Sequence, residues 1–451
     1  MAEERRITSS RIGRLSQLGR LAGGIVGGAM AEGARQVARG QRLSVGDLLL
    51  TPGNAQRLGD RLSEMRGAAM KVGQLLSMDS GQLLPPQFGE LLARLRGDAH
   101  AMPLGQVAGV LKQAWGEGWE SRFARFAFTP LAAASIGQVH QATLKDGQRL
   151  AVKIQYPGIR ASIDSDVENV ATLLRFASLV PAEIDFAPLL QEAKDQLHAE
   201  ADYRREAVAI GRFAELLEPD SRFEVPAVSE TLTTEQTLTM QFLDGDPIES
   251  LAEAPTLERN EAAAALLELA LREVFDWGLV QTDPNFANFL YSPHSKRIQL
   301  LDFGATRDYE PELRNALNNL LGACIDGNDG DVAACAMAVG YLDQADPARY
   351  RDSVVALLRT ATEPARSTGD YAFGRSDLAE RMKDTVMDMR LEQKFARMPP
   401  PPVLFLHRKL GGLYLLLSRL RASIPVAGMI APLISAAAQP LETQPASMRA
   451  V

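Results

Sequence analysis

The chain has 451 residues, of which 46% are hydrophobic and 23% are charged, and its net charge of −8 corresponds to a pI of about 5.4. This composition is ordinary for a folded globular protein, and the length allows one large core or two to three smaller ones. The acidic balance argues against a nucleic-acid-binding protein, and two cysteines without a neighbouring histidine argue against a zinc site or a structural disulfide.

Residues 1–58 form a predicted N-terminal extension with an amphipathic, Gly/Ala-rich helix. Arginines precede the apolar stretch "LAGGIVGGAMAEGA", an outline that a signal peptide shares, although a signal peptide is usually richer in leucine. We prefer a helix whose small-residue face at 20–38 lets another helix or a lipid surface approach closely. No run of 18 apolar residues is present, so the sequence predicts a peripheral membrane contact rather than a span.

Hydrophobic periodicity changes along the chain. The spacing is helical at 59–97, and "GQVHQATLKDGQRLAVKIQY" then predicts two strands joined by Asp146 and Gly147. Helical sequence resumes at 160–218, including one helix near 187–216, and "TLTTEQTLTMQFLDG" returns to strand sequence. Most of the remainder is helical, ending in a stretch at 403–421 and an apolar segment that packs or lies at an interface.

This order of elements predicts an α+β, bilobal protein-kinase-like fold with extra helices in front. The alternation differs from the regular βαβα pattern of a doubly wound sheet. The predicted parts are an extension at 1–58, a helical subdomain at 59–125, an N-lobe with inserted helices at 126–245 and a helical C-lobe at 246–451.

The segment "QTDPNFANFLYSPHSKRIQLLDFGA" places Asp283, Asn288 and Asp302 beside short strands. A carboxylate followed five residues later by an amide has the spacing of a kinase catalytic loop, and Asp-Phe-Gly follows the next strand. We therefore interpret Asp283 as the group that orients the acceptor, and Asn288 and Asp302 as ligands of Mg²⁺ bound with ATP. The alternative is a set of turn-capping side chains, which are frequent at strand ends.

"RLAVKIQY" places Lys153 within a Val/Ile-rich strand, where an unpaired charge would be costly to bury. A lysine after a β-turn-β unit is the kinase pattern for the residue that holds the α- and β-phosphates, and the alternative is a surface lysine on an edge strand. We expect Glu206 to be its partner and the backbone of Gln241 and Leu243 to meet adenine. The preceding loop, "LAAASIGQVH", has small residues whose amides can approach phosphates.

Together these motifs resemble the atypical kinase-like family known as ABC1, UbiB or Coq8, and the chain is closest to the Coq8-like branch. The resemblance covers about residues 10–420. Its signatures are the Ala-rich loop "AAAS", the "KVGQ" helix and the acidic "EADYRREA" segment, which here supply Ala132, Ala133, Ala134, Ser135, Lys71, Gly73, Gln74, Glu200 and Asp202. The family usually reads "HADPHPGN" where this chain has "QTDPNFAN", so that Gln281, Asn285 and Ala287 depart from it, with Gln281 at a scaffolding position.

The resemblance implies an ATP- and Mg²⁺-dependent kinase or ATPase with Asp283 and Lys153 as catalytic residues. It also implies that the Lys71 helix, paired with Glu200 or Asp202, guards the acceptor side, so that the acceptor is a small or lipid-like molecule. We expect support of ubiquinone biosynthesis and a cytoplasmic protein held at the inner membrane, with a homodimer through the N-terminal helix and no nucleic-acid partner. The alternative is a nucleotide-binding accessory protein that presents lipids without net phosphotransfer.

Overall fold

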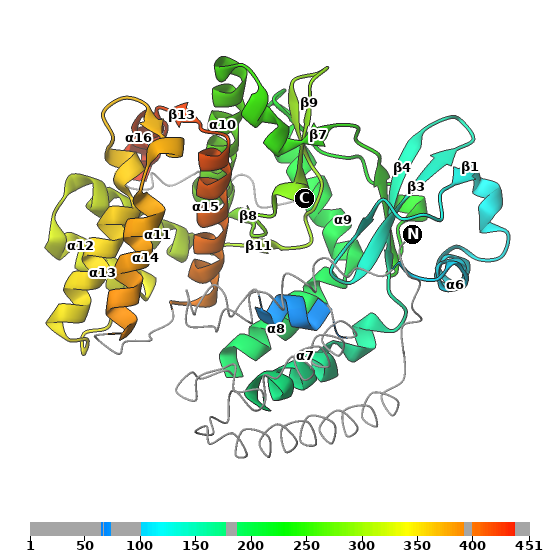
Figure 1. Cartoon of the computed structure of the whole chain (residues 1–451), viewed down its shortest axis with the longest axis horizontal. Coiled ribbons are helices and arrows are strands. Elements are labelled where there is room, and N and C mark those ends of the chain that lie inside the picture. The colour runs from blue at the N-terminus through cyan, green and yellow to red at the C-terminus, as the bar shows by residue number, and fades with distance from the viewer. Residues whose placement is uncertain (1–64, 66, 74–100, 177–186, 392–398, 438–451) are drawn as a thin grey trace, which may run out of the picture. The chain divides into compact units, whose positions relative to one another are not determined.

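The computed structural model describes residues 65, 67–73, 101–176, 187–391 and 399–437 (Figure 1). The chain divides into two compact units. Unit 1 comprises the chain up to Pro219 together with the later segment Val225–Leu243, and unit 2 comprises Asp220–Glu224 together with the chain from Asp244 onward. The change between units at Leu243 lies two residues before the boundary that the sequence predicts. The predicted N-terminal helix and Gln74 lie outside the described residues.

Unit 1 is built on an antiparallel sheet in the order β1-β3-β4-β6, with β2 paired to β3. Its strands are β1 (Phe123–Phe126), β2 (Ala132–Ala133), β3 (Gly137–Leu144), β4 (Arg149–Gln155) and β6 (Thr237–Gln241). Gly147 has φ 91° in the turn between β3 and β4, which confirms the hairpin that Asp146 and Gly147 predict. Because β4 lies between β3 and β6, Lys153 is on a central strand and the edge-strand alternative is wrong.

Unit 1 also contains helices. They are α6 (Leu104–Trp115), η1 (Trp119–Arg122), α7 (Ile159–Phe176), α8 (Ala187–Glu200), α9 (Tyr203–Leu217), η2 (Glu230–Leu232) and a helical segment at 67–73. The single helix predicted near 187–216 is wrong, because the chain breaks between α8 and α9. Gln155 of β4 donates a 2.7 Å hydrogen bond to the carbonyl of Ala201, which holds this break against the sheet.

Unit 2 contains the strands around the predicted catalytic loop. One sheet has the order β5-β10-β9-β7, and β8 pairs with β11 in a second ladder. The strands of unit 2 are β5 (Phe223–Glu224), β7 (Asp246–Pro247), β8 (Leu279–Gln281), β9 (Phe289–Ser292), β10 (Arg297–Leu300), β11 (Thr306–Asp308), β12 (Tyr371–Ala372) and β13 (Ser423–Ile424). Antiparallel pairing of β9 with β10 makes the hairpin that carries Asn288 at its start and Asp302 after its end.

Most of unit 2 is helical, as predicted. Its helical segments are η3 (Ile248–Glu253), α10 (Thr256–Leu271), the π-helix η4 (Arg272–Trp277), η5 (Phe286–Asn288), α11 (Pro311–Asp326), α12 (Asp329–Val339), α13 (Ala348–Ala361), η6 (Glu363–Arg366), η7 (Phe373–Arg375), α14 (Leu378–Leu391), α15 (Pro401–Arg419) and α16 (Val426–Ala437). Helix α15 runs beside α10 (Figure 1). The predicted stretch at 403–421 corresponds to α15.

The apolar segment after α15 is a further helix, α16, which contains Pro432. Val426 and Ile430 are buried in a cluster with residues of α10 and α15, including Leu267 and Leu417. Of the two alternatives for this segment, packing against the rest of the protein or lying at an interface, the structure shows packing. Across the described ranges, no helix combines the length and apolarity needed to cross a bilayer.

Gly137 lies at a point of close packing between strands β3 and β4. A Cβ at Gly137 would lie 2.2 Å from the carbonyl oxygen of Ile154 and 3.1 Å from the Tyr203 hydroxyl, so the absence of a side chain permits the close approach. We predict that Gly137→Ala lowers the free energy of unfolding by about 1–3 kcal/mol through this overpacking. The measurement is urea denaturation followed by circular dichroism.

Gly109 in α6 is the matched control, because a Cβ there would meet no atom within 4 Å. Gly109→Ala should raise the free energy of unfolding by about 0.5–1 kcal/mol through the helix propensity of alanine. Equal stability changes in the two variants would contradict the overpacking argument.

Candidate functional site

Lys153 and Glu206 form a buried ion pair within unit 1. The Lys153 ammonium lies 2.5 Å from Glu206 Oε1, and the two side chains are 9% and 3% exposed. Glu206 lies on the same face of α9 as buried apolar residues at helical spacing, including Ile210 and Phe213, so helix packing turns its carboxylate toward β4. The pair is the one that the sequence predicts, and its role in nucleotide binding stays a prediction.

A second lysine–glutamate pair connects the helical segment at 67–73 with the Ala-rich loop. The Lys71 ammonium pairs with Glu200 Oε1, and Ser135 Oγ donates a 2.8 Å hydrogen bond to Glu200 Oε2. Glu200 therefore joins the Lys71 segment to the loop through both of its carboxylate oxygens. Asp202 has a different place, because it caps α9 by accepting a 3.0 Å hydrogen bond from the Arg205 amide.

The backbone of the predicted nucleotide-binding segments is partly engaged elsewhere. The amide of Ala134 donates to the carbonyl of Gly137 at 2.9 Å, within the turn between β2 and β3. The amide of Gln241 donates to the carbonyl of Ala227 at 2.8 Å. These two amides therefore already have acceptors within unit 1. The nucleotide contacts of Ala132, Ala133, Ala134, Ser135, Gln241 and Leu243 stay predictions.

The hairpin of unit 2 brings the three predicted catalytic-loop residues together. Asn288 Nδ2 donates a 3.2 Å hydrogen bond to Asp283 Oδ2. The amide of Leu301 donates to the carbonyl of Asn288 at 3.0 Å, which places Asn288 across the hairpin from the residue that precedes Asp302. Asp302 Oδ1 accepts a 3.0 Å hydrogen bond from the Gly304 amide, so the carboxylate organises its own turn.

Gln281 connects Asp283 with Asp302. Its Nε2 donates to the carbonyl of Asp302 at 3.0 Å, and its Oε1 accepts from the amide of Asp283 at 2.9 Å. Gln281 is 7% exposed and lies at the end of β8. One buried amide side chain therefore fixes the backbone at both candidate positions, which is the scaffolding role expected for this position.

Gln281 also contacts a buried charge pair that the sequence analysis did not predict. Lys409 of α15 donates to Glu273 Oε2 at 2.6 Å and to the carbonyl of Gln281 at 2.9 Å. The amide of Gln281 donates to the same Glu273 oxygen at 2.7 Å. Burial raises the pKa of Glu273, whereas the Lys409 ammonium opposes that rise.

Arg408, the neighbour of Lys409 on α15, pairs with Asp283 Oδ1 through Nη2. The sequence analysis missed this residue together with Lys409 and Glu273. The signal available was "LFLHRKLGGLYLL", in which three consecutive basic or ionisable residues interrupt an apolar helix. Such a pattern indicates that these side chains are either exposed to solvent or paired with acidic groups, but it does not identify the acidic partner.

The oxygen donors of the hairpin fit a magnesium ion that is shared with phosphate. Among the residues that the structure describes, no group of three or more His, Cys, Asp or Glu side chains could hold a metal by itself. Asn288 and Asp302 supply one amide and one carboxylate, and Mg²⁺ is commonly held by one or two carboxylates together with substrate phosphates. The donor set therefore agrees with a metal that arrives with a nucleotide.

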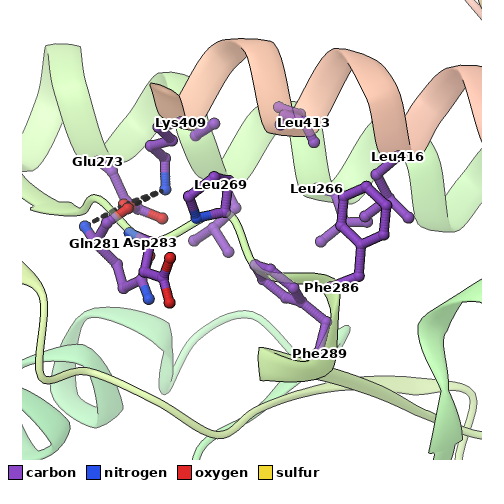
Figure 2. Close-up of a pocket in the computed structure, with 13 residues that line it drawn as sticks. Leu266, Leu269, Glu273, Gln281, Asp283, Phe286, Phe289, Lys409, Leu413 and Leu416 are labelled. Carbon is purple, nitrogen blue, oxygen red and sulfur yellow. Dashed lines mark hydrogen bonds and ion pairs between the residues drawn. The ribbon is translucent and has the colours of Figure 1, made fainter. Parts of the chain in front are cut away.

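Figure 2 shows a crevice beside this network, bounded by α10, α15 and the loop at 283–289. Leu266, Leu416 and Phe286 form one end, while Glu273 and Lys409 lie at the other. Its volume of about 30 Å³ has room for about two water molecules. Small-molecule sites are usually about ten times larger, so the crevice as it stands is too small to hold a drug-sized ligand.

Comparison with known proteins decides the family. Residues 94–336 match the family described as "ABC1 atypical kinase-like domain". The chain is 38% identical over 425 residues to the atypical kinase COQ8B, mitochondrial, of Rattus norvegicus, covering 94% of this chain and 80% of that protein. The chain belongs to the ABC1 atypical kinase-like family.

Other members of the ABC1 family give the same result. Atypical kinase COQ8 of Saccharomyces cerevisiae is 37% identical over 421 residues, which cover 93% of this chain and 83% of the yeast protein. Atypical kinase coq-8 of Caenorhabditis elegans is 35% identical over 437 residues, and the chain spans 58% of the length of that relative. Both are named as mitochondrial proteins.

A solved structure supports the fold. The Rv3197–erythromycin complex from Mycobacterium tuberculosis has a TM-score of 0.60 and 27% sequence identity, and the match covers 86% of this chain and 97% of that one. The predicted α+β, protein-kinase-like fold in two units is confirmed. The resemblance to the ABC1 family that the motifs predict is confirmed as well.

The buried Lys409–Glu273 pair should be costly to break. Lys409→Met removes the cation and leaves Glu273 buried, where its desolvation is no longer compensated by a charge. We predict a loss of about 3–5 kcal/mol in the free energy of unfolding, measured by urea denaturation.

Lys112→Met is the control for this experiment. Lys112 pairs with Glu117 at 2.6 Å, but the two side chains are 59% and 81% exposed. Surface pairs of this kind contribute at most about 1 kcal/mol. A comparable loss in both variants would show that Lys409 is not held in a desolvated pair.

Proposed function

We propose that this protein is an ATP- and Mg²⁺-dependent phosphotransferase or ATPase that acts on a small or lipid-like molecule. The observation that carries the proposal is the buried ion pair of Lys153 and Glu206. Lys153 lies on a central strand, 2.5 Å from the carboxylate of Glu206 on α9. Kinases use a strand lysine paired with a helix glutamate in this way to place a cation beside the phosphates. A purely structural pair of this burial would often be matched or exceeded in stability by apolar residues.

Each predicted site residue takes a separate role in this proposal. Lys153 would hold phosphate oxygens, and Gln241 and Leu243 would supply backbone groups to adenine. Asn288 and Asp302 would hold the metal. When bound, Mg-ATP supplies the phosphoryl group together with the divalent charge that screens it. Asp283 would orient the attacking hydroxyl or water, while Gln281 keeps the Asp283 backbone fixed.

A small acceptor fits better than a protein. After Asp302-Phe303-Gly304 the chain forms the short strand β11 and enters α11 at Pro311. This connection leaves no long activation segment in which a peptide platform could form. The Lys71 segment, fixed to Glu200, would guard the acceptor side, as the family resemblance implies. We further propose a quinone precursor as acceptor and a membrane as its location, in support of ubiquinone biosynthesis.

The direct test is turnover of Mg-ATP by the purified full-length chain. Phosphate release and phosphoryl transfer are measured with and without liposomes and a quinone-like phenol. Turnover that rises with either addition supports an enzyme acting on a lipid-like acceptor. Nucleotide binding without turnover under all these conditions would instead favour the accessory protein that presents lipids.

Asp302 should be needed for metal-dependent nucleotide binding. We predict that ATP at one hundred times its Kd stabilises the wild type by about 2.7 kcal/mol when Mg²⁺ is present. Asp302→Asn should lose most of this stabilisation, because an amide cannot replace the carboxylate charge on the metal. The measurement is thermal unfolding with ATP, with and without Mg²⁺.

Asp352→Asn is a charge-matched control, since Asp352 lies exposed on α13. It should keep the full Mg-ATP shift. The metal assignment fails if Asp302→Asn and Asp352→Asn respond to Mg-ATP alike.

Asp283 should matter for turnover rather than for binding. We predict that Asp283→Asn lowers kcat about 10²–10⁴-fold, the usual contribution of a positioned acid or base, while the Kd for ATP changes little. Steady-state phosphate release and the thermal shift with Mg-ATP measure the two quantities separately. Unchanged turnover in this variant would remove Asp283 from the proposed mechanism.

A further inference from the structure

Helix α15 presents a guanidinium to the predicted catalytic carboxylate. Arg408 Nη2 donates to Asp283 Oδ1, and the two side chains are 13% and 24% exposed. A charge-assisted contact that is mostly withdrawn from solvent is stronger and more directional than a surface ion pair. This contact joins residues that are 125 positions apart in the sequence.

The remaining contacts of Asp283 hold it from other directions. Its Oδ2 accepts the 3.2 Å hydrogen bond from Asn288, and its amide donates the 2.9 Å hydrogen bond to Gln281. Both carboxylate oxygens therefore have a donor, and Arg408 supplies the charged one. If Asn288 turned toward a metal, Arg408 would still fix the carboxylate through Oδ1.

Two features of α15 fix the position of Arg408 itself. The adjacent Lys409 is anchored to Glu273 and to the carbonyl of Gln281. Gly412, which is four residues after Arg408 and so shares its helix face, lies against Pro284, where a Cβ would come within 2.2 Å of the Pro284 Cβ. The helix is thus seated on the residue that follows Asp283, with little freedom to shift.

We propose that Arg408 is a positioning residue that acts through Asp283, and this inference rests on the proposed function. The guanidinium holds the Asp283 carboxylate in one orientation, so that Oδ2 faces the attacking hydroxyl or water. Misplacement of a reacting group by about 1 Å can cost about a hundredfold in rate. Arg408 therefore contributes to the turnover step and leaves nucleotide affinity to other residues.

The first experiment separates kcat from KM for ATP. Arg408→Gln should lower kcat by about ten- to a hundredfold with KM for ATP changed by less than about twofold. Arg408→Lys keeps the charge but loses the planar guanidinium, so its kcat should lie between that of the wild type and that of Arg408→Gln. Arg419→Gln is the control on the same helix, because Arg419 is 63% exposed and lies 3.8 Å from Glu249. It should keep wild-type kinetics.

The second experiment is a double-mutant cycle with Asp283→Asn, read from residual phosphate release. If Arg408 acts through Asp283, Arg408→Gln should cause almost no further loss in the Asp283→Asn background. An equal loss in both backgrounds, or a rise in KM with kcat unchanged, would overturn the inference. Thermal unfolding of each variant checks folding, and Arg408→Lys carries the test if Arg408→Gln does not fold.

The outcomes also distinguish this inference from the proposed function. Absence of turnover in the wild type overturns both. Turnover that depends on Asp283 but is unaffected by Arg408→Gln overturns the positioning role alone. A tenfold or larger fall in kcat that disappears in the Asp283→Asn background supports it.

Discussion

A buried contact between one ammonium and one carboxylate organises the candidate catalytic loop. Lys409 and the amide of Gln281 both donate to the same oxygen of Glu273, so α15, η4 and β8 meet at one atom. A charge in such a place has to be compensated, and three separate chain segments are needed to do so. The geometry around Asp283 and Asp302 follows from this requirement, because Gln281 extends from the junction to both residues.

Unit 1 uses the same physical principle twice. Lys153 with Glu206 and Lys71 with Glu200 each extend a flexible side chain to a fixed carboxylate. A lysine alone has several rotatable bonds and no preferred end point, whereas a lysine paired with a buried glutamate has a defined position. Ser135 adds the Ala-rich loop to the second pair, so the loop and the Lys71 segment share Glu200.

Local patterns revealed the parts of this protein that are encoded locally. Strand alternation with Asp146 and Gly147 was enough to predict the β3–β4 hairpin, and the family resemblance was carried by short motifs. Arg408 escaped prediction because its partner lies 125 residues away, and helix periodicity says only that such a residue is paired or exposed. The break between α8 and α9 was missed because Ala201 and Asp202 interrupt no hydrophobic pattern, and the Gln155 bond that holds the break is tertiary.

The π-helix η4 sets a length constraint on the segment that carries Glu273. A π-turn holds one residue more than the corresponding α-helical turn, so it changes the phase between α10 and the chain that follows. Removing one residue between Glu273 and Leu279 would shorten the connection from Glu273 to Gln281, whose amide donates to the Glu273 carboxylate. Substitution at the exposed Asp276 leaves the phase unchanged. The number of residues in η4 therefore matters more to the candidate catalytic loop around Asp283 than the identity of the exposed residues in η4.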